Sequence, residues 1–270
     1  MINVPRLVAG LLVSTLIGYI AYRRHSLTRS GWLGAIITGS ATFGFGGWAW
    51  GSTLIAFFIS SSLLSRYKQQ QKQQIAGEKF EKGGERDLWQ ALANGGIGAA
   101  LAFLYGFVGA DAILAMFAGV MATVTADTWA TELGVLSRTQ PRLITTLQPA
   151  APGTSGAVTL LGLLASLAGS LFIGLCLLLG WRLEYGVWAV WLLAAAGLGG
   201  LAGSLFDSLL GATIQAMYRN DQGDQTERGQ GRDGQPYDHM AGWRWVNNDT
   251  VNLVSSFLGG ICALIVVLVV

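Results

Sequence analysis

The sequence predicts an all-α, polytopic membrane protein with about eight transmembrane helices. Charged residues make up only 12 % of the 270 residues, about half the roughly 25 % that is typical of soluble domains. Hydrophobic residues make up 52 %, and the 38 glycines suit close packing of helices in a bilayer. Apolar runs near the ~20 residues that cross a hydrocarbon core recur along the chain. We therefore expect residues 1–270 to form a single integral-membrane domain.

Eight apolar runs are the candidate spans. They cover residues 5–22, 31–46, 48–65, 88–109, 111–133, 156–181, 186–216 and 250–270. Arg23 and Arg24 follow the first run, and no small-residue cleavage pattern occurs there, which favours a retained span over a signal peptide. The second and third runs are separated by so few residues that they form either two full spans or a re-entrant pair. Eight crossings would leave both termini on one side of the membrane.

The basic residues predict the orientation of these spans. With eight crossings, 15 of the 17 Lys and Arg residues fall on one side, and only Arg6 and Arg182 fall on the other. Cytoplasmic loops of membrane proteins carry an excess of Lys and Arg. We therefore expect both termini outside and the long polar loops, at about residues 66–87, 134–155 and 217–248, in the cytoplasm. The Gln-rich tract in the first of these loops has the composition of a solvated linker.

Acidic and amide side chains lie at the predicted cytoplasmic ends of four helices. An ionisable residue inside a transmembrane segment costs a few kcal/mol on insertion scales, so each one is a functional hypothesis. Oxygen ligands from several helices are also what Mg²⁺ bound to a polyphosphate requires. The set comprises Asn94, Asp127, Glu132, Asp207, Asn248, Asp249 and Asn252. Helix capping or an interhelical hydrogen bond is the alternative for each, above all for Asp249 at the start of the last run.

Two segments and one further arginine are candidates for binding phosphate. Residues 152–156, Pro-Gly-Thr-Ser-Gly, precede the sixth run and would place backbone N–H groups and hydroxyls at a helix N-terminus. A second segment, residues 79–86, places cations immediately before the fourth run. The candidate phosphate-binding residues are Lys79, Lys82, Arg86, Arg142, Thr154, Ser155 and Gly156. Ordinary loops also have such compositions.

Common soluble-enzyme motifs do not occur in the sequence. It contains no Walker A, GxGxxG, HExxH or Ser-His-Asp pattern, which argues against soluble-type kinases, dinucleotide enzymes and zinc proteases. Cys176 and Cys262 both lie inside apolar runs and form no CxxC pair. Neither a disulfide framework nor a zinc site is therefore indicated.

Several sequence blocks, in order, resemble the signature of one integral-membrane family. The blocks are QALANG from Gln90, ADTWATELG from Ala126, Pro141-Arg142 with GTSG from Gly153, GSLFDSLLGA from Gly203, and NDTVN from Asn248. The family contains the phytyl-phosphate kinase of the vitamin E (tocopherol) pathway and many uncharacterised membrane relatives. The resemblance implies transfer of a phosphoryl group from a nucleoside triphosphate, CTP in the plant enzyme, to a prenyl monophosphate. The product would be the prenyl diphosphate, formed at the cytoplasmic face.

The residues and the resemblance together give a hypothesis for the site. Asp127, Glu132 and Asp207 are the expected catalytic carboxylates, and with Asp249 they would hold Mg²⁺. Asn94, Asn248 and Asn252 would support them. Since a phosphate acceptor is already ionised, the site would act mainly by positioning and charge neutralisation.

Two alternatives remain at this stage. A prenol kinase or a cytidylyltransferase acting on a membrane lipid would use Glu132 or Asp127 as a general base. A small-molecule or lipid transporter would also carry intramembrane carboxylates, and the similar triplets around Asp127 and Asp207 suggest an internal repeat. Transporters, however, place such charges near the bilayer midplane, whereas these lie near one interface.

The expected partners follow from the hypothesis. They are a prenyl monophosphate, a nucleoside triphosphate and membrane lipids, with no nucleic acid. The expected location is a bacterial-type cytoplasmic membrane or a thylakoid membrane. Oligomeric state and prenyl chain length stay open.

Overall fold

The computed structural model is mostly helical and describes residues 3–76, 79, 84–231 and 233–269. The helices are α1 (Val4–Arg23), α2 (Arg29–Ala41), the π-helical η1 (Thr42–Gly46), α3 (Trp48–Arg66), α4 (Gln69–Ala76), α5 (Leu88–Val108), α6 (Asp111–Gly134), α7 (Leu160–Tyr185), α8 (Trp191–Thr213) and α9 (Asn248–Val269). Within the described residues, seven of these helices are long and apolar enough to cross a membrane: α1, α3 and α5–α9. The predicted helical membrane fold is confirmed.

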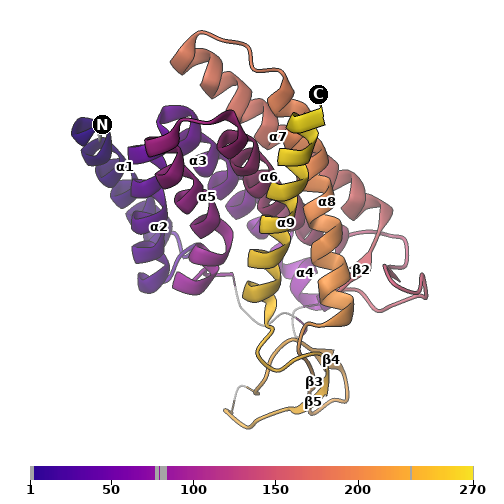
Figure 1. Ribbon diagram of the computed structural model, residues 1–270. Helices are drawn as coiled ribbons and strands as arrows, with labels where there is room; N and C mark the ends of the chain where they lie inside the picture. Colours follow the sequence, from indigo (N-terminus) through magenta and orange to yellow (C-terminus); the bar gives the residue numbers. More distant parts are fainter. Residues whose placement is uncertain (1–2, 77–78, 80–83, 232, 270) are drawn as a thin grey trace.

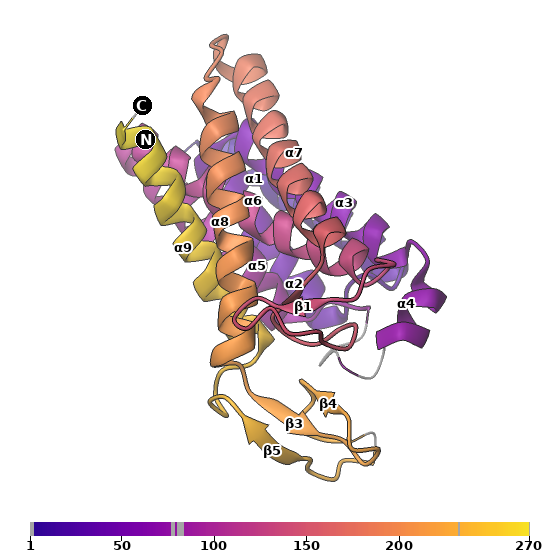
Figure 2. The same ribbon diagram turned by 90° about the vertical axis from the view of Figure 1, so that its right-hand side faces the viewer.

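Short strands occupy two of the loops. Strand β1 (Arg142–Leu143) pairs antiparallel with β2 (Ala157–Val158). Strand β3 (Met217–Arg219) lies between β4 (Gln225–Thr226) and β5 (Asp238–Ala241) in an antiparallel sheet. Figure 2 shows this sheet beyond the ends of α8 and α9. The third polar loop is therefore partly ordered by strand pairing.

The second and third apolar runs form a hairpin that reaches both ends of the bundle. The hairpin turns at Gly47, whose φ of 104° is accessible mainly to glycine. Gly47 packs against the carboxylate of Glu184, which forms an ion pair with Arg6 at the start of α1. At the other end of the hairpin, Arg66 Nη2 donates a hydrogen bond to Ser26 Oγ at 2.8 Å, just beyond the end of α1. The hairpin therefore extends along the length of α1, and of its two arms only α3 is by itself long and apolar enough to cross a membrane.

The termini lie at one end of the bundle and the long loops at the other (Figure 1). We call the end that carries the loops 67–87, 135–159 and 214–247 the loop end, and the opposite end the terminal end. The chain passes between these ends in α1, in α2 with η1, in α3, and in α5 to α9. Because α2 is not among the seven described helices that could cross a membrane, the eighth span stays a prediction. The excess of basic residues predicts that the loop end faces the cytoplasm.

Helix α6 forms the centre of the bundle. It contacts α3, α5, α7, α8 and α9, and 72 % of an apolar stretch of 18 of its residues is buried inside the bundle. Trp50 of α3 packs on Phe117 of α6 with ring centroids 4.1 Å apart. Large apolar side chains such as Leu12, Leu63 and Leu183 are exposed on the outer helices, as expected of a surface that faces lipid.

Candidate functional site

A polar cavity of about 660 Å³ lies at the loop end. Helices α3 to α9 and the loop between α6 and α7 contribute to its wall. It brings together many of the residues predicted from the sequence: Arg86, Asn94, Asp127, Glu132, Thr154, Ser155, Gly156, Asp207, Asn248, Asp249 and Asn252. Its volume lies within the roughly 300–1,000 Å³ that is usual for small-molecule sites.

Helices α6, α8 and α9 meet closely at Thr123 of α6. A Cβ atom added to Gly203 of α8 would lie 2.1 Å from Thr123 Oγ1, and one added to Gly259 of α9 would lie 2.0 Å from it. Any side chain at either glycine would therefore push the helices apart. The Thr123 hydroxyl is itself satisfied, because it donates to the carbonyl of Gly119 at 2.8 Å.

One helical turn nearer the loop end, three polar side chains converge. Asp127, Asp207 and Ser255 each lie four residues from the contact between Thr123, Gly203 and Gly259, so the glycine packing sets their proximity. Ser255 Oγ donates to Asp207 Oδ2 at 2.9 Å, and the carboxyl groups of Asp127 and Asp207 lie close enough to interact.

The contact between Asp127 and Asp207 has a chemical consequence. Two carboxylates this close repel each other when both are ionised, and a cation bound between them would remove that repulsion. The similar triplets noted in the sequence therefore meet face to face. Ser255 was not among the predicted residues, because a serine in an apolar helix carries no distinctive signal.

Glu132 lies at the edge of the cavity and is held by two side chains. Ser65 Oγ donates to Glu132 Oε1 at 2.5 Å, and Lys72 forms an ion pair with Glu132 Oε2. Lys72 Nζ also donates to the carbonyl of Leu64 at 2.6 Å. The Gln-rich tract, predicted to be a solvated linker, is instead the helix α4, which turns Lys72 and Ala76 inward against the bundle. Nothing in the sequence distinguished Lys72 from the other basic residues of that loop.

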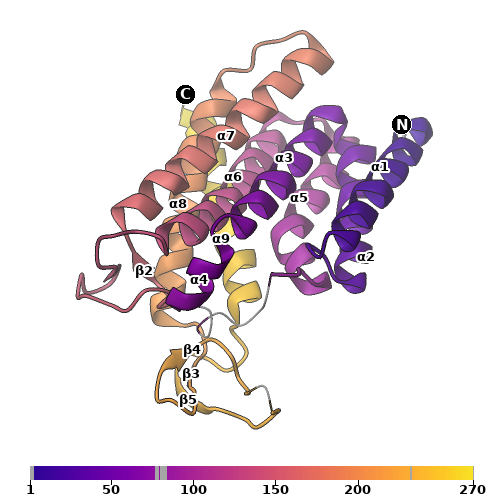
Figure 3. The same ribbon diagram turned by 180° about the vertical axis from the view of Figure 1, so that it is seen from behind.

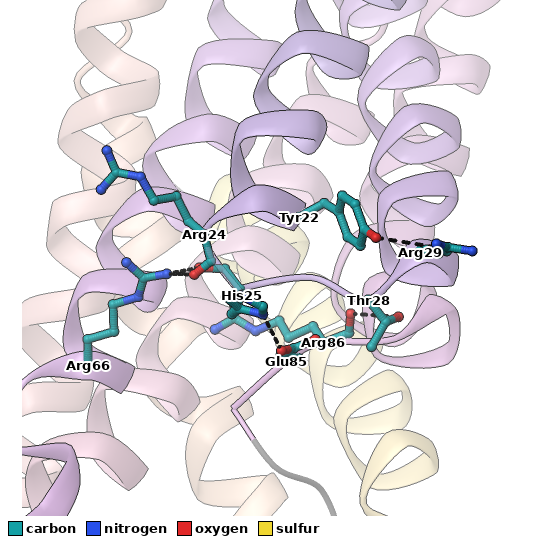
Figure 4. A network of polar contacts seen from close by, with 9 residues as sticks. Tyr22, Arg24, His25, Thr28, Arg29, Arg66, Glu85 and Arg86 are labelled. Atoms are coloured by element: carbon teal, nitrogen blue, oxygen red, sulfur yellow. Dashed lines mark hydrogen bonds and ion pairs between the residues drawn. The ribbon is translucent and has the colours of Figure 1, made fainter.

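Arg86 is fixed by the chain segment between α1 and α2. Its backbone N–H donates to the carbonyl of Ser26 at 3.0 Å, and its carbonyl accepts from Thr28 N at 3.0 Å. Figure 4 shows Arg86 in this network beside the contact between His25 and Glu85. Burial lowers the pKa of the Arg86 guanidinium from its usual value, and the Glu132 carboxylate acts in the opposite direction. Arg86 lines the cavity wall, and its role in binding phosphate stays a prediction.

The segment of Thr154, Ser155 and Gly156 lines the cavity but not at a helix N-terminus. Helix α7 begins at Leu160 rather than at about residue 156, because Gly156 has a φ of 74° and Thr159 provides the N-cap. Ser155 Oγ donates to Gln215 Oε1 at 3.0 Å, which ties the segment to the end of α8. The expected helix-terminus anion site is therefore not formed here.

Two other predicted phosphate-binding residues, Arg142 and Lys79, are not placed in the described part of the cavity wall. Arg142 is exposed and donates to the carbonyl of Leu147 at 2.7 Å, and it is not among the described residues that line the cavity. Lys79, also not among them, accepts at its carbonyl a hydrogen bond from Glu227 N at 3.0 Å, and burial lowers the pKa of its ammonium group. Lys82 lies outside the described residues.

The first turn of α9 presents Asn248, Asp249 and Asn252 to the cavity. The side chain that caps this helix is Asn247, whose Oδ1 accepts from Thr250 N at 3.0 Å. Capping therefore does not account for the placement of Asp249. On the opposite wall, Asn94 Nδ2 donates within its own helix to the carbonyl of Gln90 at 2.9 Å.

The arrangement limits how a metal ion could be held. Among the described residues, no group of three or more His, Cys, Asp or Glu side chains could hold a metal ion. The four predicted ligands, Asp127, Glu132, Asp207 and Asp249, are thus not gathered into one such group. The pair Asp127 and Asp207 nevertheless suits Mg²⁺, which in nucleotide sites takes one or two carboxylates and completes its shell with phosphates and water.

Comparison with known proteins identifies the family. Residues 12–260 match the family described as integral membrane protein DUF92. The chain belongs to this family. The match confirms the relationship that the sequence blocks indicated, and it covers all the residues that line the cavity.

Relatives in the family occur in plants and archaea. Protein PGR of Arabidopsis thaliana is 34 % identical over 94 % of this chain and 93 % of its own length. An uncharacterised membrane protein of Methanocaldococcus jannaschii is 32 % identical over 97 % of this chain and 94 % of its own length. Protein VTE6, chloroplastic, of Arabidopsis thaliana is 26 % identical over 88 % of this chain and 65 % of its own length. No solved structure matches the chain.

Proposed function

We propose that this protein transfers the terminal phosphoryl group of a nucleoside triphosphate to a prenyl monophosphate at the loop end. The observation that carries the proposal is the paired carboxyl groups of Asp127 and Asp207 in the wall of a large polar cavity. The family resemblance adds the substrate class, with phytyl phosphate as the example and CTP as the donor.

The position of the carboxylates suits an amphiphilic substrate. Asp127 lies seven residues before the end of α6, which is about 10 Å along the helix axis. Asp207 lies at a similar distance from the end of α8. A lipid phosphate could keep its tail in the bilayer at this depth while a nucleotide enters the cavity from the loop side. A transporter would favour carboxylates near the midplane, so this placement argues for the enzyme.

The proposed reaction needs charge neutralisation more than proton transfer. An oxygen of the acceptor phosphate attacks the γ-phosphorus, the bond to the β-phosphate oxygen breaks, and a nucleoside diphosphate leaves. When bound by Asp127 and Asp207, Mg²⁺ would offset the charge of the polyphosphate. Lys72 and Arg86 bring positive charge to the same wall and would orient the phosphates. No general base is required, because the acceptor is already ionised.

A lipid alcohol is the second candidate acceptor. An ionised carboxylate at Asp127 or Asp207 would accept the proton of an attacking hydroxyl. The same cavity would then serve a prenol kinase. The two candidates differ in product, since one makes a diphosphate and the other a monophosphate.

One assay separates these candidates. Purified protein is incubated with Mg²⁺, each of the four radiolabelled nucleoside triphosphates, and either geranylgeranyl monophosphate or geranylgeraniol. We expect labelled diphosphate from the monophosphate, with CTP the best donor. Labelled monophosphate from the alcohol alone would support the prenol kinase. No labelled lipid from any combination would contradict both and favour a transporter.

A further inference from the structure

A second, mostly apolar cavity lies beside the polar one. It has a volume of about 80 Å³ and lies between α1, α2, α3 and α5. Figure 3 shows these helices together on one side of the bundle. The apolar wall includes Val13 and Ile17 of α1, Ala35 of α2, and Leu54 and Ile55 of α3.

The two cavities meet at three residues. Arg86, Gln90 and Asn94 line both of them. The Arg86 guanidinium lies 5.9 Å from the ring centroids of both Phe57 and Phe58, so its apolar side is covered by aromatic rings. The Arg86 guanidinium and the side-chain amides of Gln90 and Asn94 thus lie at the boundary between the polar and the apolar cavity. An anionic amphiphile bound across this boundary would place its head in the polar cavity and its tail in the apolar one.

We propose that the apolar cavity binds the first part of the substrate's hydrocarbon tail, with the lipid phosphate held at Arg86, Gln90 and Asn94. This inference rests on the proposed function, because it takes the occupant to be a lipid monophosphate. Charge complementarity favours that occupant: an anionic head meets Arg86, and the tail continues into the apolar wall. A neutral lipid would form no ion pair with the Arg86 guanidinium.

The size of the cavity specifies how much of the tail it holds. At about 10–15 Å³ for each water-sized group, 80 Å³ accommodates about six groups of methylene size. This corresponds to little more than one isoprene unit, which has five carbons. Ile55 lies two residues further from the loop end than Phe57, which packs on Arg86, or about 3 Å further along the helix axis. A prenyl tail of five carbons or more would therefore reach Ile55, whereas a one-carbon phosphate ester would not.

A matched pair of substitutions on α3 tests the tail site by activity. Ile55→Trp fills the deep end of the cavity, whereas Ile59→Trp places the same ring one turn away on a side chain that is 49 % exposed on the outer surface. We expect Ile55→Trp to raise the KM for geranylgeranyl phosphate about tenfold and to leave that for methyl phosphate, which has no tail to bind, unchanged. Ile59→Trp should change neither. Equal effects of the two variants, or no effect of Ile55→Trp on the longer substrate, would overturn the proposal.

A binding experiment tests the site without relying on turnover. The wild-type protein in detergent is photolabelled with an alkyl monophosphate that carries a diazirine near its fifth carbon, and the labelled peptides are mapped. We expect labels on Val13, Leu54 or Ile55, reduced by unlabelled geranylgeranyl phosphate and not by geranylgeraniol. Labels confined to outward-facing residues such as Leu12 would overturn the tail site.

The two experiments separate the tail site from the enzyme activity. Competed labelling of the cavity without phosphoryl transfer would retain the lipid-phosphate site and reject the kinase. Phosphoryl transfer with uncompeted labelling of the outer surface would retain the kinase and reject the tail site.

Discussion

The two ends of the bundle both hold partly buried carboxylates, but in opposite ways. At the terminal end, Glu184 pairs with Arg6 at 3.3 Å and accepts a hydrogen bond from Ala49 N at 2.8 Å, so its charge is neutralised by the fold. At the loop end, Asp127 and Asp207 are packed against each other beside a large cavity. Paired opposite charges tie helices together, whereas like charges held together in a membrane indicate a site that serves a ligand.

The comparison is tested most strongly at the loop-end carboxylates. Asp127→Asn and Asp207→Asn should each lower kcat by about 10³-fold or more, because a carboxylate that neutralises the polyphosphate complex is lost. Neither should lower the melting temperature in detergent, since each removes a like-charge contact. Asp111→Asn, at the other end of the same helix, is the matched control and should leave kcat unchanged. Full activity in both variants would reject the role of this pair.

The glycine contact that positions the carboxylates is the next test. Gly203→Ala should lower kcat about a hundredfold, because its Cβ would displace α8 from Thr123 and separate Asp207 from Asp127. Unfolding should become easier by about 1–3 kcal/mol. Gly96→Ala on α5 is the control, because its Cβ would meet only Leu92 Cβ, at 3.9 Å. Similar activity in the two alanine variants would show that the close contact does not position the carboxylates.

Substitution of Lys72 should have a smaller effect on activity, and this effect should act through nucleotide binding. Lys72→Met removes a cation whose side chain is 9 % exposed and which contacts Glu132. We expect the KM for the nucleoside triphosphate to rise about tenfold, with a lesser change in the KM for the lipid. Lys68→Met changes an exposed lysine nearby and should have no effect. A larger change in the lipid KM would place Lys72 with the acceptor instead.

At the terminal end, we expect a carboxylate substitution to lower stability and to leave activity nearly unchanged. Glu184→Gln weakens the ion pair with Arg6 and should lower the free energy of unfolding by about 1–3 kcal/mol. The kcat of the remaining folded protein should stay within about twofold of the wild type, since no described cavity residue is touched. A loss of activity without a loss of stability would mean that the two ends are coupled.

Much of the candidate site could be predicted from the sequence because depth along a helix is a local property. The spacing of Asn94, Asp127 and Asp207 from their helix ends placed them in one leaflet, and the structure lines one cavity with all three. Position in a loop proved less informative. Arg142 and Lys79 lie in basic loops but are not among the cavity residues described, whereas Lys72 reaches Glu132 from a tract that resembled a linker.

The sequence by itself determined the helical spans, the sidedness of the basic residues and the family. These properties depend on the transfer free energy of each segment and on motifs that are local in the chain. Only the tertiary structure decided that Asp127 meets Asp207 and Ser255, that α7 begins at Leu160, and that two cavities share Arg86. The physical reason is that contacts between helices depend on how closely two backbones approach. That approach is set here by Thr123 against two glycines from distant parts of the chain.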